Sequence, residues 1–222
     1  MFEKIKTKSA FTPAEVLITL VIIGVVAALT IPTAVNNYRK QQYVQALKKT
    51  YSVVFAQATN RIIAERGAAQ NWVTTAEDVY NIYKKYLNVA KDWGSSFGCL
   101  EQASEIQYLM GVKDTSYFSS FNTTSGFRFI LSDGVQVRFT PQTYPLCDYN
   151  DGRRSQGNCA FIMVDVNGTK KPNILGRDIF WFVLKNDGLY PRGCDSGSIW
   201  CNNSNGGDDC ACKVIRENAM NY

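Results

Sequence analysis

The chain has 222 residues, of which 45% are hydrophobic and 19% are charged, and its formal net charge is +5. This composition excludes a disordered chain and a protein with many membrane spans. The charge is too small to indicate nucleic-acid binding, so we expect no specific nucleic-acid partner. The sequence contains no histidine. It therefore lacks the commonest general base and the commonest zinc ligand, and we expect no enzymatic activity.

The first element is a short basic segment followed by an apolar run. Three lysines lie within residues 1–10, and residues 11–31 are mostly apolar with one charged side chain, Glu15. A helix of this length is about 31 Å long and can span a bilayer. The lysines that precede it predict a cytoplasmic N-terminus. We therefore expect a leader over 1–10, a transmembrane helix over 11–32 and a globular head over 33–222.

A cleaved secretory signal peptide and a plain signal anchor are two simpler alternatives. A signal peptide cut near Ala28 or Ala34 would have a shorter apolar region, roughly 7–15 residues, with no carboxylate in it. An anchor explains the length but neither the small residue Ala10 before Phe11 nor the acidic Glu15. A charged side chain in mid-bilayer costs about 2.5–3.5 kcal/mol on insertion scales, so Glu15 calls for a partner.

The helical pattern continues beyond Pro32 as an amphipathic stripe. Apolar residues recur there at spacings of three and four, namely Val44, Leu47, Tyr51, Val54, Phe55, Ala58 and Ile62. We expect this stripe to pack against the head and the helix to end near Gly67, which is suited to a C-cap. The whole first helix would then be about 55 residues long, half in lipid and half under the head.

The remainder of the chain predicts a second helix and then strands. A capping-box pattern, Thr74 with Glu77, begins a helix at about Ala76–Val89. The four expected strands are Phe127–Leu131, Val135–Thr140, Ala160–Val166 and Ile179–Leu184, with a hairpin turn at Ser132-Asp133-Gly134 between the first two. The head is therefore expected to be an α+β arrangement of an antiparallel sheet packed on the first helix.

All seven cysteines follow the apolar segment, which favours an oxidising compartment and disulfide bonds. Their positions are Cys99, Cys147, Cys159, Cys194, Cys201, Cys210 and Cys212. The odd number leaves at least one unpaired or bonded to another chain. We expect one bond between Cys147 and Cys159 and further pairs within 194–212, although spacing alone does not fix the pairing. Residues 193–212 have little apolar content and are expected to form a stapled loop.

The N-terminal segment Ser9-Ala10-Phe11-Thr12-Pro13-Ala14-Glu15 resembles the cleavage signal of type IV pilins and type II secretion pseudopilins. The resemblance implies cleavage between Ala10 and Phe11, with Ala10 in the place of the usual glycine, and N-methylation of Phe11. It implies that Glu15 pairs with the N-terminal amine of a neighbouring subunit, and that the helix loosens or bends at Gly24 and Pro32. Pro13-Ala14 departs from the two bulky aliphatics that are usual there, but a proline in the first helical turn costs little.

This resemblance implies a pilin-like structural subunit of a type II secretion pseudopilus or a type IV pilus-like filament. Its partners would be further copies of itself, other pilins or pseudopilins, a prepilin peptidase, an inner-membrane assembly platform and membrane lipid. It would first span the inner membrane once, with the head outside the cytoplasm, and then enter a periplasmic or cell-surface filament. The alternatives are a membrane-anchored binding or adhesion module that never polymerises, and a competence pseudopilin for DNA uptake.

The segment from Asp165 to Phe180 is similar to one found in pseudopilin-like proteins, some of which bind calcium in a late loop. Asp165, Asn167 and Asp178 offer the oxygen ligands that Ca²⁺ prefers, although the spacing is not that of an EF-hand. The alternative, which we favour, is a loop whose Asx and glycine residues only form turns. The filament function requires no cofactor. Three aromatic residues expected at the surface could form a binding face, although such residues more often pack in a core: Trp181, Tyr190 and Trp200.

Overall fold

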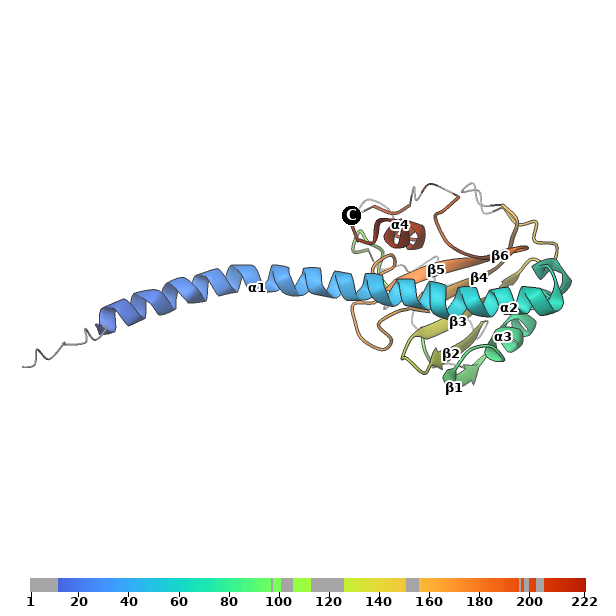
Figure 1. Ribbon diagram of the computed structural model, residues 1–222, viewed down its shortest axis with the longest axis horizontal. Coiled ribbons are helices and arrows are strands. Elements are labelled where there is room, and N and C mark those ends of the chain that lie inside the picture. Colours follow the sequence, from blue (N-terminus) through green and yellow to red (C-terminus); the bar gives the residue numbers. More distant parts are fainter. Residues whose placement is uncertain are drawn as a thin grey trace, which may run out of the picture. The chain divides into compact units, whose positions relative to one another are not determined.

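The computed structural model describes residues 12–96, 98–100, 106–112, 126–150, 156–195, 197, 200–202 and 206–222 (Figure 1). The predicted cleavage site, Ala10 and Phe11, lies outside the described residues. The chain divides into two compact units, Met1–Arg39 and Lys40–Tyr222, and each is described by itself.

A single helical stretch of 54 residues runs from Pro13 to Arg66. It comprises α1 (Pro13–Lys49), a π-helical segment η1 (Thr50–Phe55) and α2 (Ala56–Arg66). The helix ends where Gly67 takes a φ of 80° and donates its N–H to the Ile63 carbonyl at 2.8 Å. A positive φ of this kind favours glycine, so the predicted end of the helix is confirmed.

The π-helical segment follows from the spacing of the buried residues. Thr50 and Phe55 are both fully buried, and they are five positions apart. A π turn brings residues with this spacing onto one face, whereas an α turn would rotate Phe55 away. The sequence stripe, with its spacings of three and four, did not indicate this turn.

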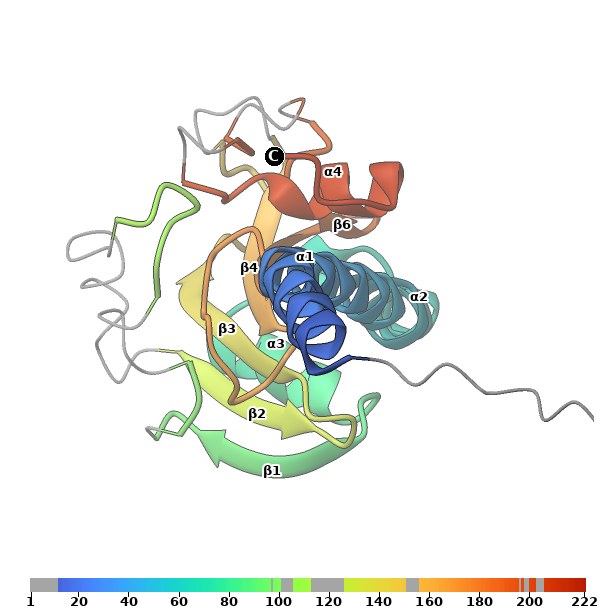
Figure 2. The same ribbon diagram turned by 90° about the vertical axis from the view of Figure 1, so that its left-hand side faces the viewer.

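The Lys40–Tyr222 unit contains a six-stranded antiparallel sheet in which every strand pairs with its neighbour in the sequence. Its strands are β1 (Val89–Gly94), β2 (Phe127–Leu131), β3 (Gln136–Thr143), β4 (Asn158–Asp165), β5 (Ile179–Lys185) and β6 (Gly188–Pro191). Three further helical elements are η2 (Ala69–Asn71), α3 (Ala76–Lys84) and α4 (Cys210–Glu217). Helix α3 lies beside β2 and β3, and α4 lies beside β5 and β6 (Figure 2).

Both faces of the sheet are covered. On one face, Phe139, Ile162 and Phe182 join a large core with the stripe of the long helix from Val44 to Ile62 and with residues of α3 and α4. On the other face, a second cluster contains Met163 and Trp181. Burial on both faces explains why β4 and β5 are nearly continuous apolar runs rather than alternating ones.

Several local expectations need correction. Helix α3 ends at Lys84 rather than near Val89, which instead begins β1. Its N-cap is Thr75, whose hydroxyl accepts from the Asp78 N–H at 3.1 Å, so the capping pair is one residue later than Thr74 with Glu77. The last part of the expected C-terminal loop forms α4, which begins at Cys210. Strands β1 and β6 were not predicted because both are short and only partly apolar.

Candidate functional site

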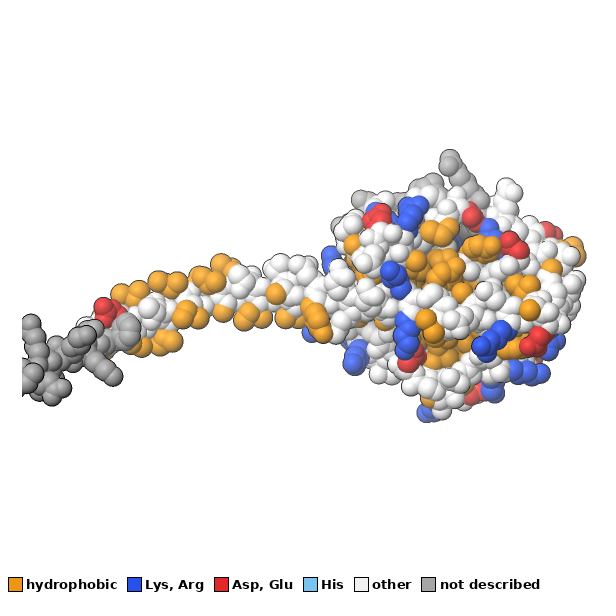
Figure 3. All heavy atoms as spheres, viewed as in Figure 1, with side chains coloured by type: hydrophobic (Ala, Val, Ile, Leu, Met, Phe, Trp, Pro, Cys, Tyr) orange, Lys and Arg blue, Asp and Glu red, His pale blue; other side chains and the backbone are white. Residues whose placement is uncertain are grey.

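The N-terminal part of α1 exposes its apolar side chains. Among the described residues, the stretch that begins at Pro13 is the one helix long and apolar enough to cross a membrane, and its most apolar window has no buried residue. Figure 3 shows hydrophobic side chains along α1. The exposed large ones are Val16, Leu17, Ile18, Leu20, Val21, Ile22, Ile23, Val25, Val26, Leu29 and Ile31. Such a surface needs lipid or another protein to cover it.

Glu15 closes the first turn of this helix in a capping box. One of its carboxylate oxygens accepts from the Thr12 N–H and from the Thr12 hydroxyl, both at 2.8 Å, and the Glu15 N–H donates to that hydroxyl at 3.3 Å. Glu15 therefore has donors within its own chain, in addition to the amine of a neighbouring chain that the resemblance implies. The Thr-x-x-Glu spacing was visible in the sequence and could have predicted this.

Gly24 and Pro32, the positions expected to loosen the helix, both lie inside α1, which does not end at either. A Cβ added at Gly24 would meet no atom within 4 Å. No contact inside the described chain therefore requires glycine at this position. A close approach by another helix would require it, because small residues allow helix backbones to pack tightly in lipid.

The three candidate calcium ligands lie together in the β4–β5 connection. The Asp165 carboxylate accepts from the Asn167 N–H at 3.0 Å, and the Asn167 amide donates to Asp178 at 2.9 Å. Asp178 also accepts from the backbone N–H groups of Asn173 and Ile174, at 2.8 and 2.6 Å. The two aspartates are 1% and 0% exposed. Burial, and then the neighbouring Asp178, raises the pKa of Asp165 to about 8; burial also raises the pKa of Asp178.

These hydrogen bonds form the turns that the sequence analysis favours, and calcium binding stays its alternative. The carboxylate oxygens that would bind a cation already accept hydrogen bonds from backbone N–H groups. Among the described residues, no group of three histidines, cysteines or acids could hold a metal ion. The donor set has the chemistry that Ca²⁺ prefers. Asp165 forms an Asx turn with the Asn167 N–H, and Asp178 accepts from the two backbone N–H groups of Asn173 and Ile174. The buried aspartate pair is also unsuited to hydrolysis, because its carboxylates are closed to solvent.

The β4–β5 connection contacts both the long helix and the β2–β3 turn. The Asn167 amide lies 3.4 Å from the Tyr43 hydroxyl of the long helix. Gly168 has a φ of 70°, and a Cβ there would lie 2.6 Å from the Gly134 carbonyl oxygen of the β2–β3 turn. The loop therefore connects the sheet hairpin to the helix that carries the exposed apolar segment.

Three disulfide bonds join Cys147 with Cys159, Cys194 with Cys212, and Cys201 with Cys210. The expected first pair and the expected pairing within 194–212 are thus confirmed. The seventh cysteine, Cys99, has no disulfide and is 4% exposed. A thiol buried in this way is not placed to bond another chain.

Several buried charged or aromatic residues were not anticipated. Arg128 and Arg138 pair across β2 and β3 and are both buried; burial, followed by the charge of Arg128, lowers the pKa of Arg138 to about 10. Arg192 forms a buried ion pair with Asp209 at 3.2 Å. Trp181, expected at the surface, is 2% exposed and belongs to the second cluster.

The other two aromatic candidates, Tyr190 and Trp200, are partly exposed. The Tyr190 hydroxyl donates to Asp187, and the Lys185 amine lies over its ring. With Trp181 buried, the three residues do not form a common binding face.

Scans against models of known protein families, curated proteins and solved structures return no match to this chain. The proposed function therefore rests on the residues and contacts of this chain alone.

The buried aspartate pair predicts that the protein loses stability as pH rises. The folded-state pKa of Asp165, about 8, exceeds the unfolded value of about 4, so between these values the folded state holds the extra proton. The free energy of unfolding should fall through this window, by at most about 1.4 kcal/mol per pH unit for one proton, and level off above pH 8. Asp165→Asn should stabilise the protein at pH 8 and change little near pH 4, as measured by urea unfolding in detergent. The exposed Asp148→Asn is the control; equal pH profiles for the two variants would contradict the assignment.

Calcium should leave the melting temperature unchanged, because the aspartate oxygens accept from backbone N–H groups. Thermal unfolding of the full chain in detergent, with millimolar Ca²⁺ and then with a chelator, measures this. A rise in melting temperature that the Asp165→Asn variant lacks would instead show that a cation replaces those hydrogen bonds.

Proposed function

We propose that the protein is a pilin-like structural subunit that waits in the inner membrane and then assembles into a filament through its N-terminal helix. The observation that carries this proposal is the uncovered apolar surface of α1 together with Glu15 at its start. An anchor needs the apolar length, and a carboxylate in the first turn serves it only as a cap of the helix. A subunit that must align with its neighbours can use that charge to fix the axial register.

The head fits the same role. One helical stretch contains both the apolar segment and the stripe that is buried in the head core. Three disulfides within the head suit a protein that works outside the cytoplasm. Within this class we favour a secretion pseudopilus over a pilus or a DNA-uptake filament, because the segment from Asp165 to Phe180 resembles one in pseudopilin-like proteins.

Processing is the first test of this proposal. Expression with a prepilin peptidase should shorten the chain to begin at Phe11 and add one methyl group to its amine, as read by intact mass and N-terminal sequencing. The same expression without the peptidase is the control. A chain that stays uncut, or that is cut near Ala28 or Ala34, would contradict the proposal.

Two substitutions at Glu15 separate its possible roles. Gln also completes a capping box, so Glu15→Gln keeps the first turn closed but removes the charge, whereas Glu15→Ala removes both. If the charge is needed for assembly, both variants should be lost from sheared filaments while remaining in the membrane. Thr12→Ala is the matched control, because it breaks the box and keeps the charge.

Normal incorporation of Glu15→Gln with loss of Glu15→Ala would show that Glu15 only caps the helix. Normal behaviour of both variants, together with the absence of filaments, would support the alternative of an anchored binding module that never polymerises.

A further inference from the structure

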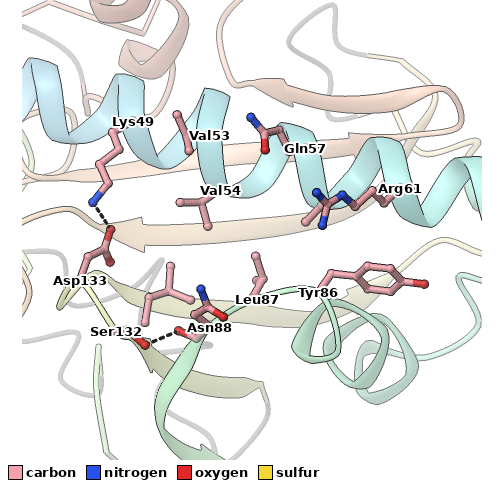
Figure 4. A pocket seen from close by; sticks show the side chains of 12 residues that line it. Lys49, Val53, Val54, Gln57, Arg61, Tyr86, Leu87, Asn88, Ser132 and Asp133 are labelled. Atoms are coloured by element: carbon pink, nitrogen blue, oxygen red, sulfur yellow. Dashed lines mark hydrogen bonds and ion pairs between the residues drawn. The ribbon is translucent and has the colours of Figure 1, made fainter.

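A groove lies in the head between the long helix and the β2–β3 turn (Figure 4). It has a volume of about 310 Å³. Val53 contributes an exposed apolar wall from the helix, and Val54, Leu87 and Leu131 add further apolar lining. The groove is therefore large enough to receive an apolar side chain from outside.

The two helix residues at the ends of this groove are basic. Lys49 is paired with Asp133 at 2.8 Å, beside the β2–β3 turn. Arg61, three helical turns further on, is exposed and makes no ion pair with any residue that the structure describes. Figure 3 shows apolar surface bordered by basic side chains on this face of the head. An apolar group accompanied by one negative charge would complement the groove.

The head itself carries such a group after β3. The Cys147 N–H donates to the Tyr144 carbonyl at 2.8 Å, which closes a turn with Pro145 and Leu146 at its tip. Leu146 is 76% exposed, the highest value among the large hydrophobic residues. The bond from Cys147 to Cys159 fastens this turn to β4. Leu146 is thus presented rigidly, at little entropic cost to a partner.

Asp148 supplies the charge. It lies two residues after Leu146, is exposed, and has no ion-pair partner within the described parts of the chain. Arg61 and Asp148 therefore carry opposite charges. Arg61 lies beside the apolar groove, and Asp148 lies beside the exposed Leu146 that could enter it.

We propose that the Leu146 turn of one copy of this chain docks into the groove of a second copy, with Asp148 against Arg61. This inference rests on the proposed filament function and names one contact between its heads. The groove and the turn adjoin opposite ends of β3, whose eight residues span about 26 Å. The contact joins two different surfaces, the groove of one copy and the Leu146 turn of the next, so it is head-to-tail. A row of copies joined in this way keeps one groove free at one end and one turn free at the other, so further copies can be added.

Photo-cross-linking tests the contact directly. A benzoylphenylalanine at Leu146 should label the tryptic peptide Thr50–Arg61 of a second copy, as identified by mass spectrometry. The same probe at Val112, which is 55% exposed, is the control and should not label that peptide. Cross-linking is performed in cells and also with the purified full chain in detergent, so it can be measured whether or not filaments form. Labelling of lipid, of another protein or of scattered peptides would overturn the proposal.

A charge exchange provides a second test, with the probe unchanged and the two charged residues varied. With the photo-probe at Leu146, Arg61→Glu or Asp148→Arg alone should lower the cross-link yield roughly fivefold, as expected for loss of a surface ion pair. The two together should restore most of it, since the charges are only exchanged. Loss without rescue in the double variant, or no loss in either single variant, would overturn the proposed contact.

Comparison with the Glu15 variants separates the two proposals. Filaments that form normally without the cross-link would overturn the head contact and leave the filament function intact. A cross-link in cells in which the chain is neither processed nor assembled, although a prepilin peptidase is present, would support the head contact and count against the filament function.

Discussion

The structure depends on one constraint: a single helix carries two apolar surfaces, of which the head covers only one. From Val44 to Ile62 the helical stripe is buried in the head core. From Val16 to Ile31 the large side chains stay exposed. Apolar surface left in water costs about 25 cal/mol per Å², so the second surface needs lipid or other helices. A core alone would not require this helix to extend so far, and its added length is the part that is long and apolar enough to cross a membrane.

The helix from Val44 to Ile62 packs against several elements of the head. Phe55 packs against Tyr83 of α3 and Phe182 of β5, which joins three elements at the π-helical segment. The polar C-terminal region contributes little apolar surface and is held by two disulfides and the buried Arg192–Asp209 pair. Covalent staples thus replace core packing where the sequence lacks apolar residues.

The sequence predicted the features that depend on local chemistry. The end of the helix at Gly67 and the Ser132–Gly134 hairpin follow from residue type and spacing. The Cys147–Cys159 bond was expected and is present, although spacing alone does not fix the pairing. The misses depend on contacts between distant segments. Trp181 is buried because a second cluster covers the outer face of the sheet, and the π turn exists because Phe55 must reach Phe182. The periodicity of a single segment predicts neither the second cluster nor the π turn. The Asx turn at Asp165 was foreseen as an alternative, but the burial of both aspartates was not.

In the proposed filament, the capping box changes how Glu15 would act. Its carboxylate already has the Thr12 N–H and hydroxyl as donors, so an isolated subunit does not hold a carboxylate without hydrogen bonds in the membrane. A neighbouring amine would compete with these donors, and the gain on assembly is only the difference between the two arrangements. Such a modest difference suits a register-fixing role, because most of the cohesion would then come from apolar helix packing. A subunit stable before assembly can wait in the membrane, and a small preference for the correct register is enough to align it with its neighbours.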